Sequence, residues 1–194
     1  MNQSAILILP GLFDFESAPS EGTKNLPKCE HWQSIWLKKY PNVIKVSQKN
    51  WTYADKKEWT KNLNEYIEKQ KDKEIILIGH SVACATIVHW SNDYFSKISA
   101  KIKGALLVGP TDLDLVNTIT EMNNMWPMPL LPLKFKSILV VSDNDSWVSL
   151  DRAKYFAKCW GSELVNAGSH KHINVDAGFG EWPEGEKLLQ KLME

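Results

Sequence analysis

Short runs of consecutive apolar residues recur along this chain, and stretches of helical pattern separate them. Within each run, apolar and polar positions do not alternate. Continuous apolar runs are typical of strands that are buried on both faces of a sheet. The predicted strands are Ala5–Leu9, Val43–Val46, Ile75–Ile78, Ala105–Val108, Ile138–Val141 and the short run Leu164–Val165.

Helical patterns fill the intervals between these runs. In Lys57–Lys69 the apolar side chains of Trp59, Leu63 and Ile67 recur at helical spacing, with charged residues on the other faces. The other predicted helices are His31–Lys39, Ala83–Phe95, Leu150–Trp160 and Pro183–Met193. Alternating strands and helices indicate right-handed crossovers and a mostly parallel sheet. We therefore expect an α/β fold with a sheet of about six strands, and residues 1–194 are enough for one such domain.

Charge and composition limit the classes of partner and the cellular location that we expect for this chain. The 23 Lys and Arg residues balance the 23 Asp and Glu residues, so nucleic acid and anionic membranes are not expected as partners. No apolar run approaches the roughly 20 residues of a spanning helix. The N-terminal run AILIL follows no basic segment and is interpreted as a strand rather than a signal peptide. The 3 cysteines lack CxxC spacing, which favours reduced thiols and a cytoplasmic location.

Two long segments interrupt the strand–helix rhythm, residues 12–30 and 109–133. Both leave the carboxyl edge of the predicted sheet, where open α/β sheets bind their ligands. The second segment has a group of large apolar side chains that either line a shallow pocket or cover a sheet edge. They are Met122, Met125, Trp126 and Met128.

The sequence GHSVAC, residues 79–84, joins the third predicted strand to a helix. A strand, then G-x-S-x-small, then a helix is typical of a nucleophile elbow, in which a strained turn projects a serine hydroxyl above the sheet. Gly79 and Ala83 supply the small residues that such a turn needs around Ser81. The N–H of Val82 lies where it can donate to an oxyanion. The alternative is that Ser81 is a helix N-cap without chemistry.

A serine nucleophile needs a histidine base, and that histidine needs an orienting carboxylate. In hydrolases with this elbow the order along the chain is serine, acid, histidine. The histidines that follow the last strand are His170 and His172, and either one satisfies the order. A metal site at this pair is not favoured, because no cysteine or carboxylate cluster accompanies it, and we expect no cofactor.

The other three histidines are less suitable as a base. His31 opens the first helix and precedes Ser81, His80 adjoins the serine and is expected to point away from it, and His89 lies along the following helix. Cys84 falls in the same helix and is expected to pack as a small apolar residue rather than act as a nucleophile.

The acid is expected after the fifth strand, in VVSDNDSWV. Asp145 is favoured because an apolar residue and the start of a helix follow it closely, whereas Asp143 suits a turn. A second oxyanion donor is expected after the first strand, in LPGLF. There Gly11 permits close backbone approach, and Leu12 or Phe13 presents an N–H.

Several segments together resemble a family of small serine hydrolases. They are ILILPGL, HWQSIW, EIILIGHSVAC, SDNDSWVSLDRA and KHINVDAGFGEWPEG, spread over nearly the whole chain. The family includes the retinoblastoma-binding-protein-9-like proteins and the bacterial YdeN-like proteins. The resemblance implies a three-layer α/β-hydrolase fold and a catalytic triad of Ser81, Asp145 and His172. No lid domain is expected, because only about 25 residues separate Gly109 from the fifth predicted strand. The chain departs from the family at Ala83, where glycine is usual, and in residues 13–30, which are longer than usual.

The sequence thus predicts a serine hydrolase of esterase type that acts on a small acyl substrate through an acyl-enzyme. Gly11, Trp126 and Trp147 are the candidate substrate-binding residues. A peptidase activity is a further possibility, and a monomer is expected. The alternative function is a protein-binding module with a vestigial hydrolase site, since some small members of the family are discussed chiefly as partners of other proteins.

Overall fold

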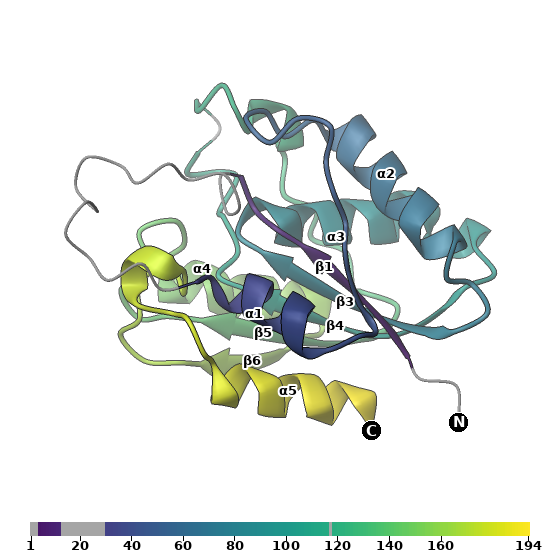
Figure 1. The fold of residues 1–194 in the computed structure, drawn as a ribbon. Helices are drawn as coiled ribbons and strands as arrows, with labels where there is room; N and C mark the ends of the chain where they lie inside the picture. The colour runs from purple at the N-terminus through teal and green to yellow at the C-terminus, as the bar shows by residue number, and fades with distance from the viewer. Residues whose placement is uncertain (1–3, 13–29, 117) are drawn as a thin grey trace.

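The computed structural model describes residues 4–12, 30–116 and 118–194, and in these residues a sheet lies between two layers of helices (Figure 1). The strands are β1 Ala5–Leu9, β2 Val43–Lys45, β3 Glu74–His80, β4 Lys101–Val108, β5 Lys136–Val141 and β6 Glu163–Asn166. The α-helices are α1 Trp32–Lys39, α2 Lys56–Glu68, α3 Val82–Tyr94, α4 Leu150–Trp160 and α5 Pro183–Met193. The short 3-10 helices are η2 Phe95–Lys97, η3 Asn123–Met125 and η4 Val175–Ala177.

The sheet has 6 strands in the order β2-β1-β3-β4-β5-β6, and every neighbouring pair is parallel. The chain leaves β1 for β2 on one side and returns to β3 on the other. The strand order therefore reverses between β1 and β3, which is where sheets of this kind bind their ligands. Leu9 pairs with Gly79 at the carboxyl ends of these two strands. The segments that follow, Pro10–Leu12 and His80–Val82, thus leave the sheet side by side.

Successive side chains of each strand enter two different cores. In Figure 1, α2 and α3 lie on one side of the sheet and α1 and α5 on the other. The core under α2, α3 and α4 takes Leu7, Leu9, Ile75, Leu77, Ala105, Leu107, Leu139 and Val141. The core under α1 and α5 takes Ile6, Ile8, Ile76, Ile78, Leu106, Val108, Ile138 and Val140. Burial on both faces explains why these strands appear in the sequence as unbroken apolar runs.

The predicted strands are confirmed, and four of them begin earlier than the apolar runs, β6 by one residue at Glu163. β3, β4 and β5 start at Glu74, Lys101 and Lys136, at the amino edge of the sheet. Glu74 forms ion pairs with Lys101 and, at 3.6 Å, with Lys103. Solvent reaches this edge, so paired charges continue a strand where a search for apolar residues stops.

The helix ends follow local capping chemistry. The Asp55 carboxylate accepts a hydrogen bond from the N–H of Glu58 at the start of α2. Ser149 caps α4 in the same way through Arg152, and α4 ends at Gly161 with φ of 70°. The predicted bounds of α4 and α5 are confirmed at both ends.

The two long segments differ in what the structure describes. Only Leu12 and Glu30 of the predicted loop 12–30 belong to the described residues, and the rest lies outside them. The connection from β4 to β5 contains the 3-10 helix η3, and no lid domain covers the sheet within the described residues.

Candidate active site

Ser81 occupies a sharp turn between β3 and α3. Its backbone has φ of 58° and ψ of −130°, a left-handed conformation that non-glycine residues rarely adopt. Its side chain makes no hydrogen bond to the first turn of α3. The interpretation of Ser81 as a side-chain N-cap is therefore wrong, because the hydroxyl is directed elsewhere.

The packing around the turn explains the small residues on both sides of it. A Cβ added at Gly79 would lie 2.8 Å from Ile87 Cδ1 and 3.1 Å from the carbonyl of Ala83. Ala83 itself is fully buried, so the methyl group that departs from the family pattern is accommodated in the core. The turn therefore tolerates alanine on its helical side and requires glycine on its strand side.

The side chains of His172 and Asp145 are hydrogen-bonded to each other. His172 Nδ1 lies 2.9 Å from Asp145 Oδ2 and 3.1 Å from Oδ1. A carboxylate accepts hydrogen bonds, so Nδ1 is the donor of this pair, and in a neutral imidazole Nε2 then has the lone pair. The backbone N–H of Trp147 donates to Asp145 Oδ1 at 2.9 Å, and the Trp147 ring lies 5.9 Å from the His172 ring. The carboxylate is thus fixed by its own loop and presents an acceptor to the imidazole.

The ends of β3 and β4 bring Ser81 and this pair to the same edge of the sheet. The Ser81 N–H donates to the carbonyl of Val108, the last residue of β4. The next residue, Gly109, has φ of 51°, and a Cβ there would lie 3.4 Å from His172 Nδ1 and 3.5 Å from Asp145 Oδ2. One strand end therefore contacts the serine turn on one side and the histidine–aspartate pair on the other.

The Ser81 hydroxyl has a partner that the sequence analysis missed. Ser81 Oγ lies 3.1 Å from Thr111 Oγ1, and Thr111 is fully buried. Thr111 follows Gly109-Pro110 directly after β4, so its closeness to Ser81 depends on the pairing of β3 with β4. Only a correct strand order would have revealed this contact from the sequence.

The predicted oxyanion donors lie at the adjoining ends of β1 and β3. Val82 is the first residue of α3, and Gly11 and Leu12 follow β1 beside the serine turn. Gly11 is buried and Leu12 is half-buried against the core. Phe13, the alternative donor to Leu12, lies outside the described residues.

Among the competing acids and bases, Asp143 and His170 have other partners. Asp143 is exposed and accepts a hydrogen bond from the Asn166 amide at 2.7 Å. His170 is also exposed, and its ring lies edge-on to Phe179. His170 and His172 therefore point to different partners, which does not fit a shared metal ion.

The remaining histidines and Cys84 are buried in packing positions. His31 caps α1, because its Nδ1 accepts from the N–H of Gln33 at 3.2 Å. His89 lies on α3 with Nε2 2.7 Å from the carbonyl of Met125, and burial lowers its pKa to about 4. The Cys84 thiol is fully buried and donates to the carbonyl of Gly79.

The segment after β4 is anchored through Arg152 of α4. Arg152 donates to both oxygens of the buried Asp112 at 2.7 and 3.0 Å, and also to Asp114. Trp126 Nε1 donates to Asp114 at 3.0 Å, and the Trp126 side chain is half exposed. By contrast, the side chains of Met122, Met125 and Met128 are buried in the core. Of the two interpretations of these methionines, the structure favours cover for the sheet.

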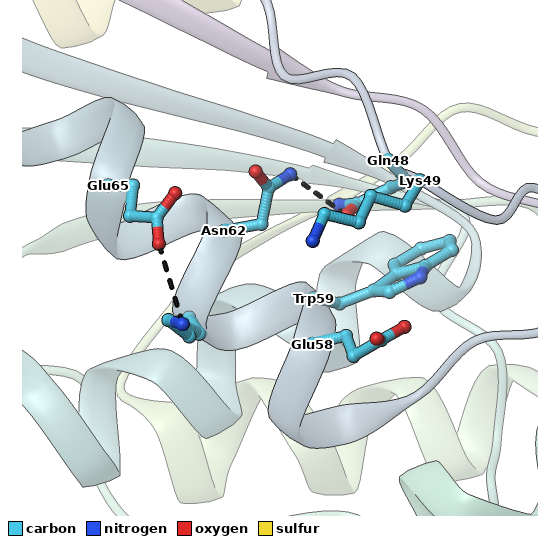
Figure 2. A pocket seen from close by; sticks show the side chains of 7 residues that line it. Gln48, Lys49, Glu58, Trp59, Asn62 and Glu65 are labelled. Carbon is cyan, nitrogen blue, oxygen red and sulfur yellow. Dashed lines mark hydrogen bonds and ion pairs between the residues drawn. The ribbon is translucent and has the colours of Figure 1, made fainter.

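Several concave regions lie apart from Ser81, including one on α2 and one beside β6. A cavity of about 120 Å³ on α2 is lined by Trp59, Asn62 and charged side chains, and Asn62 donates to Gln48 there (Figure 2). A groove of about 520 Å³ lies between the carboxyl end of β6 and the start of α5, with His170 and Phe179 in its wall. Neither is lined by Ser81, Asp145 or His172.

A parallel sheet with a serine on a strained strand-to-helix turn defines an α/β hydrolase. A sequence model described as serine hydrolase matches residues 21–191, and this chain belongs to the serine hydrolase family. No curated protein matches the sequence. None of the helices in the described parts of the chain has the length and apolar character needed to cross a membrane.

Solved structures show the same fold. A YdeN-like hydrolase from Pectobacterium atrosepticum is 29% identical with a TM-score of 0.77, covering 98% of this chain and 90% of its own. The ydeN gene product of Bacillus subtilis is 16% identical with a TM-score of 0.67, covering 98% and 99%. The esterase RhEst1 from a Rhodococcus species is 12% identical with a TM-score of 0.64, covering 98% and 91%. These similarities show that the described residues have the α/β-hydrolase fold.

Proposed function

We propose that the protein hydrolyses small carboxylic esters or similarly activated acyl compounds through a covalent acyl-enzyme on Ser81. The observation that carries this proposal is the strained turn of Ser81 beside the hydrogen-bonded pair of His172 and Asp145. A buried imidazole held by a carboxylate, at the same sheet edge as a serine on a tight turn and with the chain order serine, acid, histidine, supports this proposal.

In the proposed acylation step, His172 Nε2 takes the proton of the Ser81 hydroxyl as Ser81 Oγ bonds to the substrate carbonyl carbon. Asp145 holds the ring in the required tautomer and stabilises the imidazolium that forms. The Ser81 hydroxyl, which lies 3.1 Å from Thr111 Oγ1 in the structure, is proposed to direct its proton to His172 during this step. His172 then protonates the leaving alcohol, and the acyl group remains on Ser81.

The negative oxygen of the tetrahedral intermediate needs donors that are already in place. The N–H groups of Val82 and Leu12 are proposed for this role. Val82 begins α3 and Leu12 follows β1, and both lie at the point where the strand order reverses. A donor of this kind is worth about 2.7 to 4 kcal/mol of transition-state stabilisation. In deacylation a water loses a proton to His172 Nε2 as its oxygen bonds to the acyl carbon. The bond between this carbon and Ser81 Oγ then breaks, Ser81 Oγ takes the proton back from His172, and the carboxylic acid leaves.

The substrate class is proposed from the structural neighbours. RhEst1 is an esterase, and Est1E from Butyrivibrio proteoclasticus, which is 12% identical with a TM-score of 0.64, has been solved with ferulic acid bound. Gly11, Trp126 and Trp147 are proposed to contact the substrate, and Trp147 is the one whose ring lies near His172. We propose p-nitrophenyl esters of short acids as first substrates.

The test combines labelling with turnover. The purified protein is treated with a fluorescent fluorophosphonate and assayed on p-nitrophenyl acetate, beside Ser81→Ala and Cys84→Ala. We expect labelling of the wild type and Cys84→Ala, and neither labelling nor turnover in Ser81→Ala. Labelling that persists in Ser81→Ala would overturn the proposal. A folded wild type that is neither labelled nor active would favour the protein-binding module.

A further inference from the structure

The loop that bears His172 has a strained backbone on both sides of this residue. Lys171 has φ of 47° and Ile173 has φ of 51°, in the left-handed region. This conformation is a genuine outlier for a β-branched residue such as Ile173, which is also fully buried. Strain of this kind persists only where the surrounding structure holds the backbone in place.

Two buried rings hold the loop from the side of the α1 and α5 core. His80 Nε2 lies 2.9 Å from the carbonyl oxygen of His172, and Trp32 Nε1 donates to the carbonyl of Ile173 at 3.0 Å. A carbonyl has no hydrogen to give, so His80 must donate through Nε2. Both rings are fully buried, and the centroids of the His80 and His172 rings are 4.9 Å apart.

Side chains of the aspartate loop hold the same segment from its other side. The N–H of Lys171 donates to Asn144 Oδ1 at 2.7 Å, and the N–H of His170 donates to Ser142 Oγ at 2.8 Å. Ser142 Oγ in turn donates to Asn144 Oδ1 at 2.9 Å. The backbone of the His172 loop is therefore fixed from β3, from α1 and from the loop that carries Asp145.

We propose that His80 and Trp32 are positioning residues that hold His172 in register with Ser81. This inference rests on the proposed function, because it assigns their purpose through His172 as the base. His80 is joined to Ser81 by one peptide bond, and its ring N–H is bonded to the main chain of His172. One dipeptide thus fixes the nucleophile by its backbone and the base by its ring. Misplacement of a reacting group by about 1 Å can cost roughly 10²-fold in rate.

The test uses pairs of variants that separate the hydrogen bond from the packing. His80→Leu removes the donor, and His80→Gln keeps an N–H near the position of Nε2. We expect His80→Leu to lower kcat on p-nitrophenyl acetate about 10- to 100-fold with KM changed less than about 2-fold. Fluorophosphonate labelling of Ser81 should slow by a similar factor, and His80→Gln should recover most of both losses.

Trp32→Phe tests the second donor and has a matched control on the same helix. Trp36 is also fully buried, and its Nε1 has no hydrogen-bond partner among the described residues. We expect Trp32→Phe to lower kcat several-fold, and Trp36→Phe to leave it unchanged. This pair still decides the matter if His80→Leu fails to fold.

Three results would overturn the inference. They are a folded His80→Leu protein with the kcat and labelling rate of the wild type, a His80→Gln protein as slow as His80→Leu, and equal losses in Trp32→Phe and Trp36→Phe. A failure of the proposed function is distinguishable, because the wild type itself would then show no labelling that depends on Ser81.

Discussion

The two faces of the sheet are packed by different kinds of side chain. Under α1 and α5 the rings form one continuous set of contacts, from Phe179 through Trp182, Trp32 and His80 to His172. Under α2, α3 and α4 the aromatic contacts form separate small groups among aliphatic side chains. These groups are Trp51–Trp59, Trp90–Phe95–Phe135 and Tyr155–Phe156–Trp160. Trp147 also packs against this core, and its ring contacts His172.

This difference indicates that the two cores have different roles. Aliphatic packing contributes stability in proportion to the area it buries and imposes little direction. Rings with N–H groups also donate hydrogen bonds of fixed direction, as Trp32 and His80 do to the His172 loop. We infer that the α1 and α5 face orients the candidate site, whereas the opposite face mainly stabilises the fold.

The largest expected effect tests whether His172, which the α1 and α5 face holds in place, acts in catalysis together with Asp145. Asp145→Asn preserves the shape of the side chain but removes the carboxylate that accepts from His172 Nδ1. Because the wrong tautomer is then favoured, kcat on p-nitrophenyl acetate should fall about 10⁴-fold. The control is Asp143→Asn, an exposed position two residues earlier that should keep the wild-type kcat. Equal losses of kcat in both variants would show that the assignment of Asp145 as the acid is wrong.

A second prediction concerns the opposite face. Leu63 of α2 is fully buried in the core under α2, α3 and α4. Leu63→Ala should lower the free energy of unfolding by about 2–5 kcal/mol, measured by urea denaturation, because it leaves a cavity. At a temperature where the variant is folded, kcat should stay within about 2-fold of the wild type. Lys61→Ala, on the exposed side of the same helix, should change neither quantity. A folded Leu63→Ala protein with a much lower kcat would show that this face also orients the site.

The sequence was sufficient for much of the fold because burial on both faces leaves an unbroken pattern. The bounds of β1 were predicted to the residue, and the strain at Ser81 was predicted from the need for small residues at 79 and 83. Local composition contains this information, since each feature depends on a few consecutive residues.

Features that depend on several distant segments were not predictable from residues alone. His170 and His172 share one loop, and the choice between them rested on the family resemblance. In the structure, Lys171 and Ile173 have left-handed backbone on either side of His172, and the two rings contact different partners, Phe179 and Asp145. The contact of Thr111 with Ser81 requires the register of β3 against β4, which no single segment reveals.

The smallest expected effect concerns His89, which lies on α3. The face under α2, α3 and α4 is the one that we infer mainly stabilises the fold. Burial lowers its pKa from 6.5 to about 4, although its hydrogen bond to Met125 acts in the opposite direction. The unfolded chain therefore binds more protons than the folded protein between pH 6.5 and 4. Stability is retained above pH 6.5 and is lost as the pH falls through this window, by on the order of 2 kcal/mol between pH 7 and 5.

His89→Gln keeps an N–H that can reach the Met125 carbonyl but does not titrate in this range. The loss of unfolding free energy from pH 7 to 5, measured by urea denaturation, should therefore be smaller in His89→Gln than in the wild type by about that amount. The other titrating groups are common to both proteins and cancel in this comparison. The pH dependence of kcat should be the same in both, because His89 lies on the face opposite the His172 loop. If the pH dependence of kcat differed between His89→Gln and the wild type, the division between the two faces would be wrong. If the two proteins lost equal unfolding free energy from pH 7 to 5, His89 would not be the group responsible for this pH dependence.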